Sequence, residues 1–325
     1  MTETNAQHRG EFEFFDRQPV ASNMLEDVLI GLGSTPRKLA PKYFYNEAGS
    51  ELFQQITELP EYYPTRTERA VMDASAEQLS ALIPDGACVV EFGGGSADKL
   101  RRLLAIANPT AVVPIDISRD FLLAEARALH RDFPGLNVYP CCADFTTPVE
   151  LPEPIEDLPK LAFFPGSSIG NFTPLAAEVF LAQVARAVGS GGQLLIGVDR
   201  RKDKAVLEAA YDDAAGLTAR FNRNLLAHIN VELGATFDLS AFTHRAAYDV
   251  DAGRIDMYLV SQRPQTVHIG EHRFDFAKDE AIHTESSFKY DIAEFHALAE
   301  RAGFDAVETF SDERGWFSVY LLAAR

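Results

Sequence analysis

The most constraining feature of the sequence is an alternation of strand-like and helix-like segments between residues 87 and 199. Five segments have the composition of buried strands: ACVVEF (87–92), TAVVPIDIS (110–118), NVYPCCADF (137–145), KLAFFPGSS (160–168) and QLLIGVD (193–199). The segment after the first of them carries apolar residues at helical spacing, at Leu100, Leu103, Leu104 and Ala107. Strands that alternate with helices predict a parallel, doubly wound α/β sheet.

This rhythm breaks after Arg200 and resumes near the end of the chain. Residues 203–232 predict a long helix interrupted by Gly216, and RAAYDV and RIDMYLVSQ predict an antiparallel hairpin with its turn at residues 251–253. A helix that starts near Asp291 and ends at Gly303 is followed by two closing strands, AVETFS and WFSVYLLAA. A closing antiparallel hairpin is typical of the class I methyltransferase form of this sheet, whereas a dehydrogenase adds another parallel strand. We therefore expect the class I methyltransferase fold.

The interruption predicts a core that is discontinuous in sequence. Residues 1–66 are expected to form an N-terminal arm, loose over 1–21, and then part of a substrate lobe with a folded, aromatic lid. Residues 67–200 are expected to form the methyltransferase core, residues 201–286 the inserted part of an α+β substrate lobe, and residues 287–325 the end of the core.

Composition excludes several classes of protein. The net charge of −18 over 325 residues argues against binding to nucleic acid. The longest apolar stretches are strand-sized, and the polar N-terminus lacks the order of a signal peptide, so we expect no membrane association. Three cysteines without a CxxC pair predict no disulfide framework. These features are typical of a protein of the reducing cytoplasm.

The segment VVEFGGGSADK predicts a nucleotide-like cofactor at the turn from the first strand into its helix. Glycine there lets the backbone approach a ligand closely. Glu91 lies two residues before Gly93, and Asp116 and Asp144-Phe145 end the next two strands, where ligands of such sheets bind. Asp116 could accept the ribose hydroxyls, and Asp144 and Phe145 could hold the adenine. The alternatives are that both aspartates cap helices, and that the glycine turn serves a nicotinamide oxidoreductase.

No metal site is expected. His268 and His272 are four residues apart in strand-like sequence, where such residues lie far from each other, and a third ligand is not apparent.

Five further segments carry a resemblance to a known family. They are PKYFYNEAGSELFQQITELPEYYPTRTE (41–68), GSSIGNFTP (166–174), AAYDDAAGLTARFNRN (209–224), RIDMYL (254–259) and HTESSFKY (283–290). With the glycine turn, they resemble the histidine-specific methyltransferase family over nearly all of the chain after Ser34. That family contains the enzyme that makes hercynine, the trimethylated histidine betaine of the ergothioneine pathway.

The resemblance implies roles for individual residues. It implies S-adenosyl-L-methionine as cofactor, with contacts from Tyr45, Gly93, Lys99, Asp116, Asp144 and Phe145. It implies that Asn171 and Tyr211, the expected catalytic residues, hold the amine and carboxylate of the substrate, and that Tyr62 lines the same pocket. It implies that Glu285 and Ser287 bind the imidazole, with Met257 packed nearby. On spacing alone, Asn171 is a turn residue, Tyr62 and Tyr211 are core aromatics, Glu285 is an exposed strand end and Met257 is hairpin packing.

The glycine turn departs from the family pattern. It reads GGGSADK, where relatives more often have GSGTSEK, so Gly94, Ser96 and Ala97 replace hydroxyl-bearing or longer side chains. Ser168 likewise stands where relatives often have threonine. The loss of hydroxyl groups bears on the affinity for the cofactor carboxylate.

The expected activity is methylation of the α-amine of free L-histidine to its trimethyl betaine. The nucleophile is the neutral amine, and no residue stands out as a general base. The alternatives are the same chemistry on tryptophan or tyrosine, a protein that binds S-adenosylmethionine without catalysis, and the nicotinamide oxidoreductase.

Overall fold

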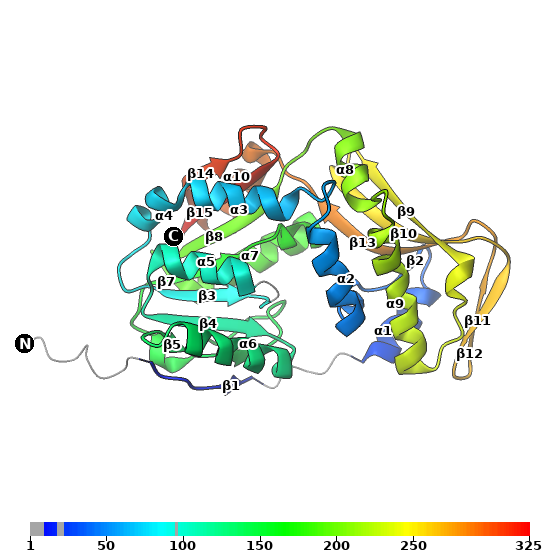
Figure 1. Ribbon diagram of the computed structural model, residues 1–325, viewed down its shortest axis with the longest axis horizontal. Coiled ribbons are helices and arrows are strands. Elements are labelled where there is room, and N and C mark those ends of the chain that lie inside the picture. Colours follow the sequence, from blue (N-terminus) through cyan, green and yellow to red (C-terminus); the bar gives the residue numbers. More distant parts are fainter. Residues whose placement is uncertain (1–9, 18–22, 95–96) are drawn as a thin grey trace, which may run out of the picture. The chain divides into compact units, whose positions relative to one another are not determined.

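The computed structural model describes residues 10–17, 23–94 and 97–325, and within it the chain divides into two compact units (Figure 1). Unit 1 comprises Met1–Val20, Thr67–Arg200 and Tyr290–Arg325, and unit 2 comprises Ala21–Arg66 and Arg201–Lys289. The sequence predicted breaks after residues 66, 200 and 286. Each unit therefore combines stretches that are far apart in the sequence.

Unit 1 is built on one large sheet. Its strands follow the order β1-β6-β4-β3-β7-β8-β15-β14, with β5 beside β4. The strands are β1 (Phe15–Asp16), β3 (Cys88–Phe92), β4 (Ala111–Asp116), β5 (Asn137–Val138), β6 (Cys141–Cys142), β7 (Lys160–Phe164), β8 (Gln193–Asp199), β14 (Phe304–Ser311) and β15 (Phe317–Ala324). Pairing is parallel from β1 to β8, while β15 is antiparallel to both β8 and β14. The predicted class I methyltransferase sheet, with its closing antiparallel hairpin, is confirmed.

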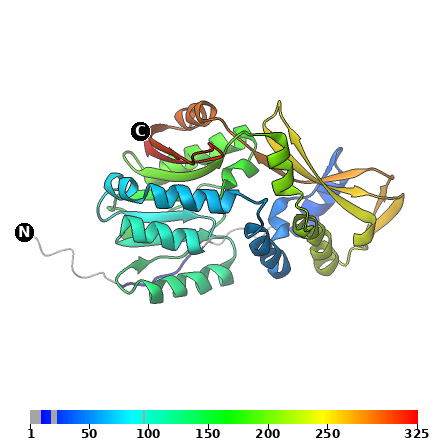
Figure 2. The same cartoon turned by 45° about the horizontal axis from the view of Figure 1, so that its top comes forward.

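Helices cover the sheet on both faces, which explains why β3 and β8 are buried along their whole length (Figure 2). The helices of unit 1 are α3 (Pro64–Ala74, whose first turn belongs to unit 2), α4 (Ala76–Leu82), α5 (Ala97–Ala107), α6 (Arg119–Asp132), α7 (Pro174–Val188) and α10 (Ile292–Arg301). Val89 of β3 packs in one core with Leu103 of α5, whereas the ring of Phe92 lies 5.9 Å from the ring of Phe180 on α7. Alternate residues of one strand thus face opposite helix layers.

The start of the chain corrects one expectation. Residues 10–17 were expected to be part of a loose arm, but Phe12 bridges to Val138 and β1 pairs with β6 at the edge of the sheet. An aromatic contact accompanies the strand pairing, since the ring of Phe15 lies 6.3 Å from the ring of Tyr139. The rest of the expected arm, residues 1–9 and 18–21, lies outside the described residues.

The third predicted strand is also corrected, because residues 137–145 form two short strands instead of one. The break falls at Tyr139 and Pro140, between β5 and β6. Proline has no backbone N–H to donate to a neighbouring strand, so the ladder cannot run through it without interruption.

In its described residues, unit 2 combines a four-stranded sheet, a hairpin and four α-helices. The sheet has the order β2-β13-β10-β9, and β11 pairs with β12. The elements are α1 (Met24–Gly33), β2 (Arg37–Lys38), the short helix η1 (Pro41–Phe44), α2 (Glu47–Thr57), α8 (Lys204–Tyr211), α9 (Leu217–Leu233), β9 (Phe242–Asp249), β10 (Arg254–Ser261), β11 (Gln265–Ile269), β12 (His272–Phe276) and β13 (Ala281–Phe288). The predicted hairpin is confirmed as β9 and β10. The long helix predicted over 203–232 is two helices, and Gly216 adopts φ +71° before the second one.

The core of unit 2 forms where α2 and α9 pack together. Gly49 allows the close approach, because a Cβ atom there would lie 2.9 Å from the side-chain nitrogen of Asn224 on α9 and 1.7 Å from the carbonyl oxygen of Phe44 in η1. Asn46 caps α2 by accepting a bond from the N–H of Gly49, and it also accepts one from the side chain of Asn224 on α9. The ring of Phe44 stacks on that of Phe221, with centroids 4.6 Å apart. The segment from 41 to 57 is therefore an integral part of this core.

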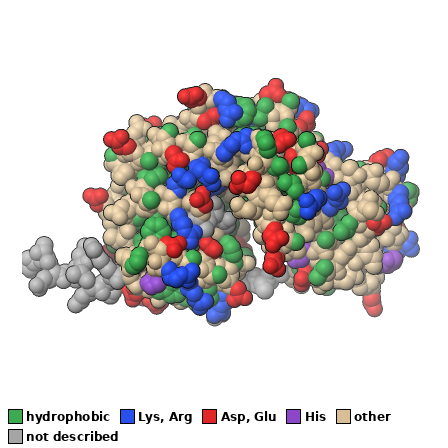
Figure 3. Space-filling model, viewed as in Figure 1, with side chains coloured by type: hydrophobic (Ala, Val, Ile, Leu, Met, Phe, Trp, Pro, Cys, Tyr) green, Lys and Arg blue, Asp and Glu red, His purple; other side chains and the backbone are tan. Residues whose placement is uncertain are grey.

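On the face drawn in Figure 3, lysine and arginine side chains are interspersed with aspartate and glutamate. Within the part of the chain that the structure describes, a helix with the length and apolarity needed to cross a membrane is not found.

Candidate functional site

The turn after β3 requires glycine at its first position. Gly93 has φ +84°, and its N–H donates to the carbonyl of Ile115 at 2.9 Å. A Cβ atom on Gly93 would lie 3.3 Å from the ring of Phe145, so the backbone passes directly beside that ring. Gly95 and Ser96, which complete the predicted cofactor loop, lie outside the described residues.

Asp116 ties the turn to the end of β4. Its Oδ2 accepts a hydrogen bond from the N–H of Gly94 at 3.1 Å, and its Oδ1 accepts one from Ser118 at 2.7 Å. Burial raises the pKa of Asp116, while the backbone donors oppose that rise. The N-cap of α6 is Ser118, so the alternative in which Asp116 is the cap residue of that helix is wrong.

Asp144 and Phe145 follow β6 at the same end of the sheet. The Oδ1 of Asp144 accepts bonds from the N–H and the hydroxyl of Thr146, at 2.9 and 2.6 Å, which makes a local turn and not a helix cap. The ring of Phe145 lies edge-on to Phe164 and Phe180, at 6.0 and 6.1 Å. We call Gly93, Lys99, Asp116, Asp144 and Phe145 the strand-end cluster.

Lys99 of this cluster forms a buried ion pair that the sequence reasoning missed. Its Nζ lies 2.5 Å from Oε2 of Glu68 on α3, and Glu68 is only 1% exposed. The Oε1 of Glu68 accepts a bond from the N–H of Gly166 at 2.8 Å, so the pair links α3, α5 and the segment after β7. A signal was present, since Glu68 ends the PTRTE segment of the family resemblance.

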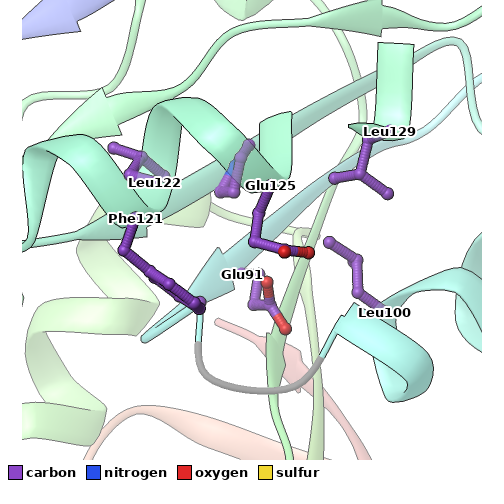
Figure 4. Close-up of a pocket in the computed structure, with 8 residues that line it drawn as sticks. Glu91, Leu100, Phe121, Leu122, Glu125 and Leu129 are labelled. Carbon is purple, nitrogen blue, oxygen red and sulfur yellow. The ribbon is translucent and has the colours of Figure 1, made fainter. Parts of the chain in front are cut away.

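Glu91 lies behind the glycine turn, in a small cavity between β3, β4, α5 and α6 (Figure 4). The cavity is lined by Glu91, Gly94, Leu100, Pro114, Phe121, Leu122, Glu125 and Leu129. Glu91 is 1% exposed, and burial, with the nearby charges of Asp116 and Glu125, raises its pKa well above the ordinary value. The protonated acid is therefore favoured at this position.

Asn171 ends a short helix, η3 (Ser168–Asn171), that follows β7, and it is exposed. The preceding turn is held by Ser167, which has φ +59° and whose hydroxyl oxygen accepts a bond from the N–H of Asp199. Thr173, not Asn171, caps α7. Asn171 therefore lies in unit 1, at the end of the sheet that carries the strand-end cluster.

The other predicted site residues lie in unit 2 around a lysine that the sequence reasoning missed. Lys289 is 2% exposed, and its Nζ donates to the hydroxyl of Tyr211 at 2.9 Å and to the hydroxyl of Ser287 at 2.8 Å. The same Nζ lies 4.8 Å from the centre of the Tyr211 ring. We call Tyr211, Glu285, Ser287 and Lys289 the lysine cluster. A lysine between Phe288 and Tyr290 was the available signal.

Glu285 stands on β13 beside this lysine. It pairs with Met257 of β10, next to an irregularity in the register of the two strands. Burial raises the pKa of Glu285 to about 7, and the charge of Lys289 opposes this rise. Met257 is 2% exposed, in line with a packing role. The expectation of an exposed glutamate, based on spacing alone, does not hold.

Tyr62 and Tyr45 connect to the lysine cluster through aromatic contacts. The ring of Tyr62 lies 6.4 Å from that of Tyr211, and both Tyr45 and Tyr62 have edge contacts with Phe53. Half of the Tyr45 side chain is exposed. Tyr45, expected among the cofactor contacts, thus lies in unit 2 with the residues expected to bind the substrate.

Within the described ranges, no group of three histidine, cysteine or acidic side chains has an arrangement that could hold a metal ion. His268 pairs with Arg273, and His272 with Ile269, across the β11–β12 hairpin.

Comparison with known proteins identifies relatives over almost the whole chain. Residues 24–324 match the family described as histidine-specific methyltransferase, SAM-dependent. The histidine N-alpha-methyltransferase of Mycobacterium tuberculosis is 41% identical over 308 residues, which cover 91% of this chain and 94% of that protein. The protein of the same name from Mycolicibacterium smegmatis is 38% identical, covering 93% and 95%. Ergothioneine biosynthesis protein 1 of Neurospora crassa is 32% identical, covering 89% of this chain and 33% of that protein.

The buried pair of Glu68 and Lys99 predicts a measurable cost when its charge balance is broken. Glu68→Gln leaves the lysine without its counter-charge and should lower the free energy of unfolding by about 3 kcal/mol. The matched control is Asp98→Asn, because Asp98 and Arg69 form an exposed pair between the same two helices. Urea denaturation should show a large loss for the first variant and almost none for the second; equal losses would contradict the account.

The raised pKa of Glu285 predicts a pH-dependent stability in the ligand-free protein. The pKa of Glu285 is raised from 4.5 to about 7 in the folded protein. Its contribution to the free energy of unfolding is therefore fully present below pH 4.5 and is lost as the pH rises through 7. Glu285→Gln cannot ionise, so its melting temperature should match that of the parent near pH 4.5 and exceed it at pH 8. Glu271→Gln, at an exposed turn of the same unit, serves as control. The prediction would be refuted if Glu285→Gln were no more stable than the parent protein at pH 8.

Proposed function

The chain belongs to the family of histidine-specific methyltransferases that depend on S-adenosylmethionine, and on this premise we propose that it methylates the α-amine of free L-histidine. The product is the trimethyl betaine hercynine, an intermediate of ergothioneine biosynthesis. The observation that carries the proposal is the lysine cluster, in which a desolvated carboxylate, Glu285, stands beside a buried ammonium. The three free, buried cysteines support a reducing cytoplasm as the location.

The strand-end cluster fits the cofactor. Gly93 leaves the backbone beside the Phe145 ring without an intervening Cβ, and Asp116 presents a carboxylate at the end of β4. We assign cofactor binding to Gly93, Lys99, Asp116, Asp144 and Phe145, and the same role for Tyr45 rests on the family resemblance alone. When bound, S-adenosylmethionine supplies an electrophilic methyl group on a sulfonium.

The departure at Gly94 is compatible with this assignment. A Cβ atom at Gly94 would lie 3.8 Å from the nearest atoms of Asp116, which is an ordinary contact. The serine of relatives would therefore fit at this position, and glycine removes a hydroxyl group without relieving a clash.

The protein residues have to orient the amine and exclude water, because displacement at a methyl group requires an in-line approach of the nitrogen. The nucleophile is the neutral amine, whose lone pair must face the methyl. We propose that Asn171 and Tyr211 orient the amino and carboxylate groups, with Tyr62 lining the pocket. Amide and hydroxyl groups do this without adding a full charge beside the amine.

Selection for histidine is assigned to Glu285 and Ser287, with Met257 packing beside them. A carboxylate that accepts the imidazole N–H forms a charge-assisted hydrogen bond. A side chain without such a donor would leave Glu285 desolvated and unpaired, at a cost of roughly 1–3 kcal/mol or more. Tryptophan and tyrosine remain the alternative substrates for the same chemistry.

The direct test is incubation of the purified protein with S-adenosylmethionine and each free amino acid in turn, followed by mass spectrometry. Histidine should gain three methyl groups, because the nitrogen, once it has lost a proton, regains a reactive lone pair after the first and second transfers and becomes quaternary only after the third. Trimethylation of another amino acid, with histidine unchanged, would refute the proposal. S-adenosylmethionine binding without formation of S-adenosylhomocysteine would indicate a non-catalytic binding protein.

Glu285→Ala separates substrate selection from cofactor binding. Turnover of histidine should fall at least tenfold, the loss expected for one charged hydrogen bond. Cofactor binding should be spared, because Glu285 lies in unit 2 and the strand-end cluster in unit 1. The dissociation constant for S-adenosylhomocysteine should change little. Losses of equal size in both measurements would contradict the assigned role.

A further inference from the structure

We infer that Lys289 is a positioning residue that fixes the direction of the hydrogen bonds offered to the amino acid. Its ammonium group makes Tyr211 a donor toward the substrate carboxylate and Ser287 a donor toward the imidazole. This inference rests on the proposed function and adds to it a residue that acts through two others.

The argument starts from the donors of the lysine. An ammonium group has three N–H donors and no acceptor. Nζ of Lys289 lies 2.9 Å from the hydroxyl oxygen of Tyr211 and 2.8 Å from that of Ser287, so both oxygens accept. Each hydroxyl has a single proton, which must then be directed to an acceptor other than the lysine. Lys289 thereby makes both hydroxyl groups donors toward the substrate.

The donor role of the Tyr211 hydroxyl decides which substrate group it can bind productively. A hydroxyl proton donated to the amine would occupy the lone pair that has to attack the methyl group. Donated to the carboxylate, the same proton leaves the lone pair free. The positive charge of Lys289, transmitted through the hydroxyl, strengthens the bond to an anionic acceptor.

The charge of Lys289 also favours the reactive form of the amine. In a free amino acid, the carboxylate stabilises the neighbouring ammonium group. A cation close to the carboxylate offsets this effect, because like charges disfavour the protonated amine. Lys289 therefore shifts the bound amino acid toward the neutral nucleophile without accepting a proton itself.

Ser287 as a hydrogen-bond donor complements Glu285 as an acceptor. The two residues are two apart on β13, so their side chains leave the strand on the same side. A neutral imidazole carries one N–H donor and one lone-pair acceptor, whereas an indole carries only a donor. Glu285 as acceptor and Ser287 as donor match both nitrogens of imidazole, so Lys289 contributes to discrimination against tryptophan.

The test compares the binding of histidine and histidinol, in which an alcohol replaces the carboxylate, by calorimetry in the presence of S-adenosylhomocysteine. Lys289→Met should weaken histidine binding roughly 10- to 100-fold and histidinol binding much less. Tyr211→Phe, which keeps the lysine side chain and removes only the hydroxyl that it contacts, should produce the same pattern. The double variant should lose no more than the worse single variant, because both changes remove one interaction.

Lys202→Met is the matched control. Its Nζ lies 2.7 Å from the hydroxyl of Tyr63 and 4.5 Å from the centre of that ring, the same kind of contact in the same unit. It should leave the ratio of histidine to histidinol affinity unchanged, because its partner Tyr63 is not among the residues assigned to the substrate.

Two results would overturn the inference: equal weakening of both ligands by Lys289→Met, or additive losses in the double variant. If Lys289→Met does not fold, Tyr211→Phe and Ser287→Ala decide. The inference would be overturned if Tyr211→Phe did not reduce the preference for histidine over histidinol and Ser287→Ala did not reduce the preference for histidine over tryptophan. Failure of the parent protein to methylate histidine would instead refute the proposed function.

Discussion

A charged side chain that is buried in a protein needs charged or polar partners there, and two such side chains, Glu68 and Lys289, lie among the candidate functional residues. Lys99 in unit 1 pairs with Glu68, and this pair holds α3 and α5 at the end of the sheet where the glycine turn lies. Lys289 in unit 2 is held by Tyr211 and Ser287. In both places one buried charge organises residues from separate stretches of the chain.

The division of residues between the units follows the demands of methyl transfer. The reaction needs a bound sulfonium and a correctly oriented amine, with little further chemistry from the protein. The strand-end cluster and Asn171 belong to unit 1, where parallel strands bring their ends together. The lysine cluster and Tyr62 belong to unit 2, whose helices and antiparallel strands form a separate core. Each unit thus supplies a distinct part of the proposed chemistry.

The features that the sequence predicts correctly are those with a strong local signal. The alternation of strands and helices, the turn at Gly93 and the closing hairpin all follow from periodicity and glycine placement. Glu68 and Lys289 were missed because their roles come from tertiary burial, which makes an ordinary charged residue into an organising one. The docking of β1 was missed for a related reason, since two residues, Phe15 and Asp16, carry no periodicity. The family resemblance assigned Tyr45 to the cofactor contacts, but it did not show that Tyr45 belongs to unit 2.

Hydrogen exchange measured by mass spectrometry tests the central claim most directly, because it reports where each ligand acts. S-adenosylhomocysteine should slow exchange in unit 1 at the turn after β3 and at the end of β4. Histidine, added to that complex, should slow exchange in unit 2 along β13 and at the end of α8, around Tyr211. Protection by histidine confined to the glycine turn, with β13 unaffected, would contradict the account.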